Sequence, residues 1–162
     1  MKRILFSIMA LAVVTFTASA QEKEEKTEEG FQFTVVKENP ITPVKNQSST
    51  GTCWCFSSLG FMESELIRMG KGEYDLSEMY VVSKTYTDKA DRYVRLDGFL
   101  NFAQGGGFDD YLYVIRKYGI VPNEVMPGLN YGEEVHRHSE LTAVLKGIVD
   151  AVKKNPNRKL ST

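Results

Sequence analysis

The 162-residue sequence predicts a mainly helical domain with very little strand. Three observations lead to this prediction. Apolar residues recur at helical spacing in several segments, glycine and proline separate these segments, and one short run alternates as a strand does. An apolar content of 42% is enough for one domain with a core, and a net charge of −1 gives no sign of nucleic-acid binding.

Residues 1–20 have the pattern of a secretory signal peptide. Lys2 and Arg3 supply positive charge, residues 4–16 are mostly apolar, and residues 18–20 form a small-residue cleavage site. An N-terminal membrane anchor is the alternative, but the apolar run is shorter than the roughly 20 residues that span a bilayer. We therefore expect an exported protein, periplasmic or secreted, with no stable membrane anchor after cleavage.

The next segments contain little regular structure. Residues 21–30 have no apolar side chain to bury and predict a disordered acidic leader. Residues 31–36 alternate and are rich in β-formers, so they predict a short strand. Residues 37–50 contain two prolines and two asparagines and predict an extended loop. We place the folded domain at residues 31–155, and a polar tail or truncation point at residues 156–162.

Two helices are predicted in the first half of the domain. The first begins near Cys53 and ends near Met69, before the glycines of residues 70–72. Its apolar face has helical spacing and consists of Phe56, Leu59, Met62, Leu66 and Met69. The second helix begins at residues 75–78, where Asp75 and Glu78 have capping-box spacing and Ser77 is an alternative cap. It extends toward Tyr93.

Two more helices follow a run of three glycines, residues 105–107. Asp109 and Asp110 favour the positive end of a helix over residues 111–118, which Gly119 terminates. A fourth helix is predicted over residues 139–153. Its apolar stripe consists of Val144, Ile148 and Val152.

The sequence contains only two cysteines, Cys53 and Cys55. In a helix their side chains would lie about 200° apart, so they cannot form a disulfide, and at least one thiol is free. A redox protein using both thiols is one hypothesis. The Cys-x-Cys spacing disfavours it, because Cys-x-x-Cys within a βαβ pattern is the usual redox motif.

Residues 43–57 carry the candidate chemistry. They predict a polar loop leading into a helix whose first residue is Cys53, where unpaired backbone N–H groups and the helix dipole favour a thiolate, the reactive form. Trp54 supplies an apolar body that excludes solvent, and Gly51 allows the backbone to approach a substrate. The side-chain amide of Gln47 is a hydrogen-bond donor of the kind that an oxyanion hole requires.

This segment resembles the signature of papain-like cysteine peptidases. The matching residues are Gln47, Gly51, Cys53, Trp54, Phe56 and Ser57. The resemblance implies an α+β fold of which this chain covers the helical left domain. It also implies that Cys53 is the nucleophile and that the Gln47 side chain and the Cys53 backbone N–H form the oxyanion hole. Gly51, Trp54, Gly106 and Gly107 are the expected contacts to a peptide substrate.

Departures from the signature indicate a particular branch. In secreted papain relatives a disulfide cysteine occupies the place of Thr50, and its partner precedes the glycine pair; here neither cysteine is present. The segment between Glu78 and Gly105 is longer than in papain. With residues 121–127, this insertion resembles the bleomycin hydrolase and bacterial aminopeptidase C branch, which implies an aminopeptidase whose full-length form is a homo-hexamer.

The catalytic histidine and asparagine of such peptidases come from a β-rich domain that is not recognisable here. His136 and His138 flank Arg137 in a polar stretch, and we expect them to be solvated loop residues rather than a catalytic base. We expect no metal or other cofactor, because no further ligands occur near them at suitable spacing. The chain is therefore interpreted as an inactive fragment of a cysteine peptidase that acts on peptides, with a non-catalytic peptide-binding remnant as the alternative.

Overall fold

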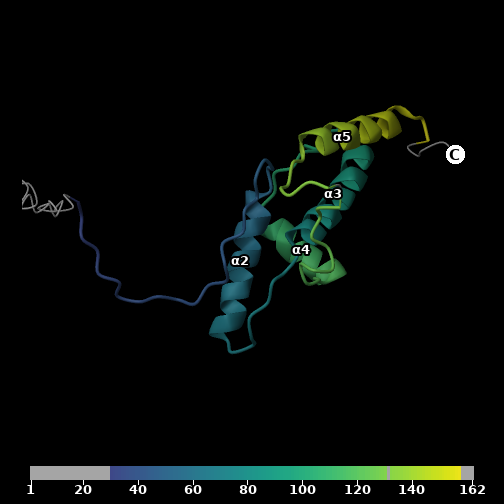
Figure 1. Ribbon diagram of the computed structural model, residues 1–162. Coiled ribbons are helices and arrows are strands. Elements are labelled where there is room, and N and C mark those ends of the chain that lie inside the picture. The colour runs from purple at the N-terminus through teal and green to yellow at the C-terminus, as the bar shows by residue number, and fades with distance from the viewer. Residues whose placement is uncertain (1–29, 131, 158–162) are drawn as a thin grey trace, which may run out of the picture. The chain divides into compact units, whose positions relative to one another are not determined.

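A computed structural model describes residues 30–130 and 132–157. The predicted signal peptide, the predicted leader except Gly30, and residues 158–162 of the predicted tail lie outside the described residues. The chain divides into two units, residues 1–36 and residues 37–162. The second unit contains the four helices shown in Figure 1: α2 (Cys53–Arg68), α3 (Glu78–Arg95), α4 (Phe108–Tyr118) and α5 (Ser139–Lys154).

Helix α2 confirms the first helix prediction at both ends. It begins at Cys53, and Met69 follows its last residue, with Gly70 in the left-handed conformation that glycine adopts readily (φ 67°). Leu59 is fully buried, whereas Met69 at the end of the predicted apolar face is 53% exposed. The part of α2 around Leu59 is therefore packed more closely than the end near Met69.

Helix α3 contacts each of the other three helices (Figure 1). Ser77, the alternative cap, is the actual N-cap, because its hydroxyl accepts a 2.9 Å hydrogen bond from the backbone N–H of Tyr80. Asp75 is not the cap; its carboxylate instead lies 2.6 Å from the ammonium group of Lys45. The capping-box interpretation of Asp75 and Glu78 is therefore wrong.

Helix α4 begins earlier than predicted, at Phe108 rather than Tyr111. Asp109 and Asp110 lie inside its first turn, and the carboxylate of Asp110 accepts a 2.9 Å hydrogen bond from the backbone N–H of Gly107. This contact satisfies one orphan donor of the glycine run and so extends the helix toward it. Gly119 ends the helix with φ 80°, as predicted.

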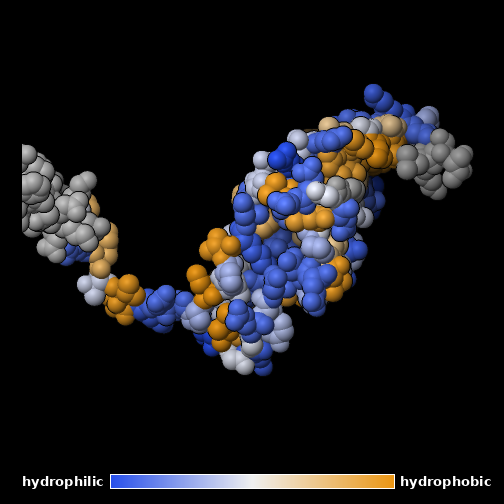
Figure 2. Space-filling view, viewed as in Figure 1, coloured by the Kyte–Doolittle hydropathy of each residue, from blue (hydrophilic) through white to orange (hydrophobic). Residues whose placement is uncertain are grey.

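Helix α5 has the predicted length to within one residue, but its predicted apolar stripe is not the buried face. Val144 and Ile148 are 55% and 44% exposed, whereas Val149 is buried. Two hydrogen bonds to α3 set this rotation: Tyr86 with Thr142, and Tyr93 with Asp150. Figure 2 shows hydrophobic side chains over α5, on the face that the helix leaves to solvent.

The predicted strand at residues 31–36 is not formed in the described chain. These residues make no ladder, and Phe31, Phe33 and Val36 are each at least 88% exposed. Strand propensity is insufficient without a neighbouring strand to supply hydrogen bonds. Within residues 30–130 and 132–157, β-structure is limited to two isolated bridges, Ser49 with Arg137 and Leu76 with Pro122.

The core of the second unit lies where α2, α3 and α4 meet. Its buried apolar residues are Trp54, Cys55, Leu59, Leu76, Met79, Val81, Val82, Tyr86, Tyr93, Phe102, Tyr111, Val114 and Val149. Among the described residues, no helix has the length and apolar character needed to cross a membrane.

Candidate active site

The two thiols point to opposite sides of α2. Cys53 is exposed, whereas Cys55 is fully buried and lies 3.5 Å from the backbone oxygen of Glu78. Burial, followed by the nearby charge of Glu78, raises the pKa of the Cys55 thiol well above its ordinary value. The predicted divergence of the two side chains is confirmed, with Cys55 pointing into the core and Cys53 out of it. Because the two thiols diverge, the geometry does not support a redox reaction between them.

Local hydrogen bonds make α2 begin at Cys53. Thr52 is fully buried, and its backbone oxygen accepts hydrogen bonds from the N–H groups of Cys55 (2.9 Å) and Phe56 (3.3 Å). The hydroxyls of Thr50 and Thr52 are 2.6 Å apart, and that of Thr50 also donates to the backbone oxygen of Gln47 at 3.0 Å. The two threonines therefore tie the preceding loop to the first turn of the helix.

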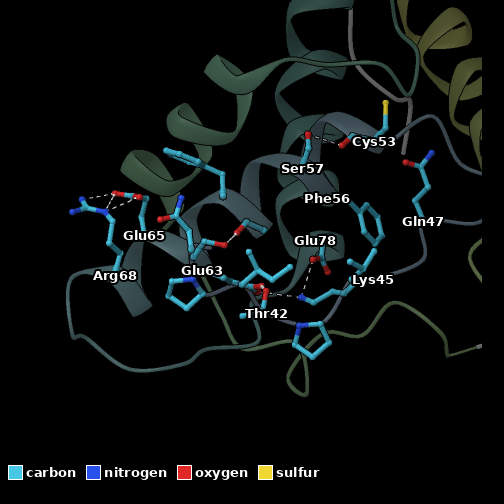
Figure 3. A pocket seen from close by; sticks show the side chains of 18 residues that line it. Thr42, Lys45, Gln47, Cys53, Phe56, Ser57, Glu63, Glu65, Arg68 and Glu78 are labelled. Carbon is cyan, nitrogen blue, oxygen red and sulfur yellow. Dashed lines mark hydrogen bonds and ion pairs between the residues drawn. The ribbon is translucent and has the colours of Figure 1, made fainter. Parts of the chain in front are cut away.

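Gln47 and Cys53 line the same cavity, of about 610 Å³ (Figure 3). The side-chain nitrogen of Gln47 donates a 2.8 Å hydrogen bond to the backbone oxygen of Thr50. An amide nitrogen carries two hydrogens, so one N–H remains to donate to a developing oxyanion while the other keeps the side chain in place. The structure thus brings together the two residues on which the predicted chemistry depends.

The glycine loop is held against α2 by Gln104. The side-chain oxygen of Gln104 accepts a 2.7 Å hydrogen bond from the N–H of Gly51, and its backbone oxygen accepts one of 3.0 Å from the indole of Trp54. In papain relatives a disulfide joins these two segments, by the resemblance described above. Here hydrogen bonds make the connection. Gln104 was not identified as a site residue from the sequence, because its partners lie far away along the chain.

Gly106, in the glycine loop, is in close contact with the indole ring of Trp54. Trp54, an expected contact to a peptide substrate, is only 8% exposed, because its indole ring packs under the loop and supports it. A Cβ atom at Gly106 would lie 2.7 Å from the indole atom Cε2, which explains the glycine there.

Gly107 has extended backbone (φ −138°) and precedes α4. Lys89 also holds the loop, through hydrogen bonds to the backbone oxygens of Ala103 and Gly105.

The two histidines are not solvated loop residues, which corrects the sequence interpretation. His138 is 7% exposed, and His136 is half-buried with its ring 6.2 Å from that of Phe56. Burial lowers the pKa of both imidazoles, and the neighbouring His136 lowers that of His138 further. This burial could not be predicted from the sequence, because the contacts join α2 to a segment distant in the chain.

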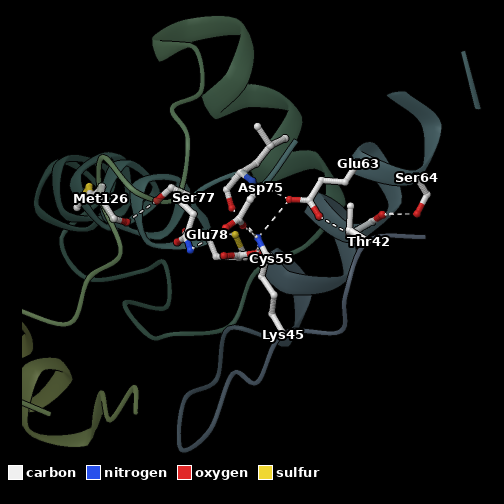
Figure 4. A network of polar contacts seen from close by, with 12 residues as sticks. Thr42, Lys45, Cys55, Glu63, Ser64, Asp75, Ser77, Glu78 and Met126 are labelled. Carbon is white, nitrogen blue, oxygen red and sulfur yellow. Dashed lines mark hydrogen bonds and ion pairs between the residues drawn. The ribbon is translucent and has the colours of Figure 1, made fainter. Parts of the chain in front are cut away.

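A charged network holds the start of the loop that leads to Gln47 (Figure 4). Sequence reasoning did not identify this network. The ammonium group of Lys45 lies 3.2 Å from Glu63, 2.6 Å from Asp75 and 2.8 Å from Glu78. Glu63 and Glu78 are buried.

The pKa values in this network reflect both burial and pairing. Burial alone would lower the pKa of Lys45, but its hydrogen bonds to Asp75 and Glu78 raise it above the ordinary value. Burial raises the pKa of Glu78, and Lys45 partly offsets this. Lys45 therefore compensates carboxylates from both α2 and α3, and it fixes the loop that leads to Gln47.

No group of three or more histidine, cysteine, aspartate or glutamate side chains suited to a metal ion occurs in the described part of the chain. The arrangement instead combines an exposed thiol at a helix start, an amide donor in the same cavity and a glycine loop beside them. This set of groups is typical of enzymes that form a covalent intermediate on cysteine.

Comparison with known proteins identifies relatives of this chain. The model of the Peptidase C1-like family matches residues 4–154. Bleomycin hydrolase of rabbit (Oryctolagus cuniculus) is 30% identical over 133 residues, and that of rat (Rattus norvegicus) is 29% identical over 133 residues. The mitochondrial cysteine proteinase 1 of Saccharomyces cerevisiae is 26% identical over 140 residues.

These alignments cover 68%, 68% and 75% of this chain, in the same order. The chain belongs to the Peptidase C1-like family, on its bleomycin hydrolase branch. It spans 46% of the length of the rabbit protein, 28% of the rat protein and 29% of the yeast protein.

Proposed function

We propose that this chain is the nucleophile-bearing part of a cysteine peptidase that trims N-terminal residues from peptides. The observation that carries the proposal is the exposed thiol of Cys53 at the first residue of α2, in one cavity with the amide of Gln47. Helix starts present backbone N–H groups without intrahelical acceptors, so the Cys53 N–H joins the Gln47 amide as a second oxyanion donor.

The reaction proceeds by acyl transfer to sulfur. The Cys53 thiolate attacks the peptide carbonyl carbon, and the resulting oxyanion accepts hydrogen bonds from Gln47 and from the Cys53 N–H. Collapse of this intermediate breaks the C–N bond and leaves a thioester, while the amine departs after gaining a proton from a general acid. Water then hydrolyses the thioester, which regenerates the thiol and releases the acid.

The general base and its orienting asparagine belong, in this proposal, to a β-rich domain that completes the site. The chain contains two histidines, and both are occupied in the packing of residues 136–138 against α2 and its preceding loop. The cavity follows one exposed face of α2 from Cys53 past Phe61 to Arg68, and Phe61, Ile41 and Val44 beside it are 57–92% exposed. This apolar surface is suited to cover by a second domain.

Export by the predicted signal peptide and assembly into hexamers are further parts of the proposal. They follow from the pattern of residues 1–20 and from the resemblance to the aminopeptidase C branch, respectively. A peptide-binding remnant of a peptidase that has lost catalysis is the weaker candidate, because the Cys53 thiol is exposed at the start of α2.

Turnover of aminoacyl fluorogenic substrates by the full-length protein tests the proposal. Cys53→Ala should abolish activity, whereas the matched change Cys55→Ala, at the buried thiol, should leave kcat nearly unchanged in the folded enzyme. Gln47→Ala should lower kcat by about 10²–10³-fold if its amide binds the oxyanion. A loss of about threefold or less would remove that role from Gln47.

A further inference from the structure

Residues 136–138 form a short strap across the loop that carries Gln47. The backbone N–H of Ser49 donates to the oxygen of His136 at 3.1 Å, and the N–H of His138 donates to the oxygen of Ser49 at 3.4 Å. These two bonds make the parallel bridge between Ser49 and Arg137. The strap therefore holds Ser49, which lies two residues after Gln47 in the loop that leads to Cys53.

The loop held in this way has a strained backbone. Ser48 adopts φ 50°, a left-handed conformation that is uncommon for a residue with a side chain. Its N–H donates a 2.8 Å hydrogen bond to the side-chain oxygen of Asn46, which supports the turn locally. Such a conformation persists only when surrounding contacts enforce it, and the bridge to Ser49 is the adjacent long-range contact.

Both imidazoles of the strap are packed without a partner for one nitrogen. The Nδ1 atoms of His136 and His138 are buried and make no hydrogen bond, and the two rings are 6.1 Å apart. Adding a proton to either ring places charge in a poorly solvated site, and charging both adds repulsion between them. Protonation of either ring therefore disfavours the closed strap.

The surroundings contain few groups that could offset such a charge. The loop residues 46–52 include no titratable side chain, and α2 presents the uncharged ring of Phe56 to His136. The charged residues that line the cavity of about 620 Å³ beside the strap are Glu133, Arg137 and Glu140. From α3, the phenol of Tyr86 reaches Thr142, whose hydroxyl donates to the backbone oxygen of His138 at 2.6 Å.

We propose that residues 136–138 are a pH-sensitive strap, which positions the Gln47 loop while His136 and His138 are neutral and releases it when they are protonated. The two histidines are positioning residues in this proposal, acting on Gln47 through Ser49. The catalytic consequence rests on the proposed function, because it assumes that Gln47 binds the oxyanion. The release of the loop itself does not depend on that assumption.

The direction of the pH effect follows from the burial of the rings. Burial lowers the pKa of both histidines below the ordinary value of 6.5, so the open strap binds more protons than the closed one. The stabilisation is complete above pH 6.5 and is lost as the pH falls from 6.5 toward the lowered values. These are the only two histidines in the chain, which makes the effect assignable.

Amide hydrogen exchange measured by NMR on the full chain tests the proposal. The protection factor of the Ser49 amide should fall by at least about threefold between pH 7.5 and pH 5.5. The Ser77 amide, which donates to the backbone oxygen of Val121 at 3.0 Å, is the internal control and should keep its protection. Unchanged protection of Ser49, or an equal fall at Ser77, would overturn the proposal.

Variants assign the effect to the imidazoles. The double change His136→Phe and His138→Phe should remove the fall at Ser49, because phenylalanine keeps a ring and does not titrate. Where the double variant does not fold, His136→Phe alone, at a half-buried ring facing Phe56, should reduce the fall. A full pH effect in a folded variant would contradict the proposal. The activity of Gln47→Ala is measured separately. A small loss of kcat in that variant would contradict the proposed function of Gln47 and would leave the pH-dependent release of the loop untouched.

Discussion

Gly106 lies directly against the indole of Trp54, so closely that a Cβ atom at Gly106 would be 2.7 Å from Cε2. Gly105, its neighbour, has no heavy atom within 4 Å of the equivalent position. The glycine run therefore combines a position at which a Cβ atom would clash with one at which a side chain has room. The loop is therefore packed against α2 at Gly106, where it meets Trp54.

The first prediction compares these two glycines. Gly106→Ala should destabilise the domain by about 1–3 kcal/mol, because the added methyl group overpacks a rigid ring. Gly105→Ala is the matched control and should change the free energy of unfolding much less. Urea unfolding of both variants measures the difference. Equal destabilisation by the two changes would contradict the packing role assigned to Gly106.

The second prediction concerns the buried charges around Lys45. Lys45→Met should destabilise the domain by about 3 kcal/mol, because Glu63 and Glu78 would lose their compensating cation. Arg68→Met, which breaks an exposed ion pair with Glu65, is the control and should shift the urea midpoint far less. The gap in free energy of unfolding between Lys45→Met and the wild type should narrow as the pH falls, because protonation of Glu78, whose pKa burial raises, removes one of the two uncompensated charges. A small loss for Lys45→Met at neutral pH would show that the network is not important for stability.

The third prediction is that Cys53 is the reactive thiol. Mild treatment of the folded chain with iodoacetamide should label Cys53, which is exposed, and leave Cys55, which is fully buried and whose pKa burial raises. Peptide mass mapping identifies the labelled residue, and both thiols should react in urea. Preferential labelling of Cys55 under native conditions would overturn the assignment.

Much of the local structure could be predicted from the sequence because its causes are local. The start of α2 at Cys53 follows from a polar loop meeting a helical apolar pattern, and the end of α4 follows from Gly119. The juxtaposition of Gln47 and Cys53 was predictable in a different way, through their resemblance to a known signature.

The remaining features depend on contacts between distant segments. The rotation of α5 is set by Tyr86 and Tyr93 of α3, so the apolar pattern of α5 alone predicts the wrong face. The burial of His138 requires the bridge to Ser49, and residues 31–36 lack the partner that a strand needs. Long-range packing of this kind leaves no periodic signal in the sequence.

The last prediction is that the chain expressed from Gln21 onward has no peptidase turnover and is poorly behaved in solution. The first expectation follows because Cys53 has no imidazole to accept its proton or to protonate the leaving amine, both histidines being packed in the strap. The second follows from the apolar side chains left in water beside the cavity, with Ile41, Val44 and Phe61 at 67%, 92% and 57% exposure. The purified chain should hydrolyse no aminoacyl fluorogenic substrate and should bind a hydrophobic dye strongly. Thiol-dependent turnover by monodisperse chain, abolished by Cys53→Ala, would contradict this prediction and would make His136 or His138 a candidate for the base.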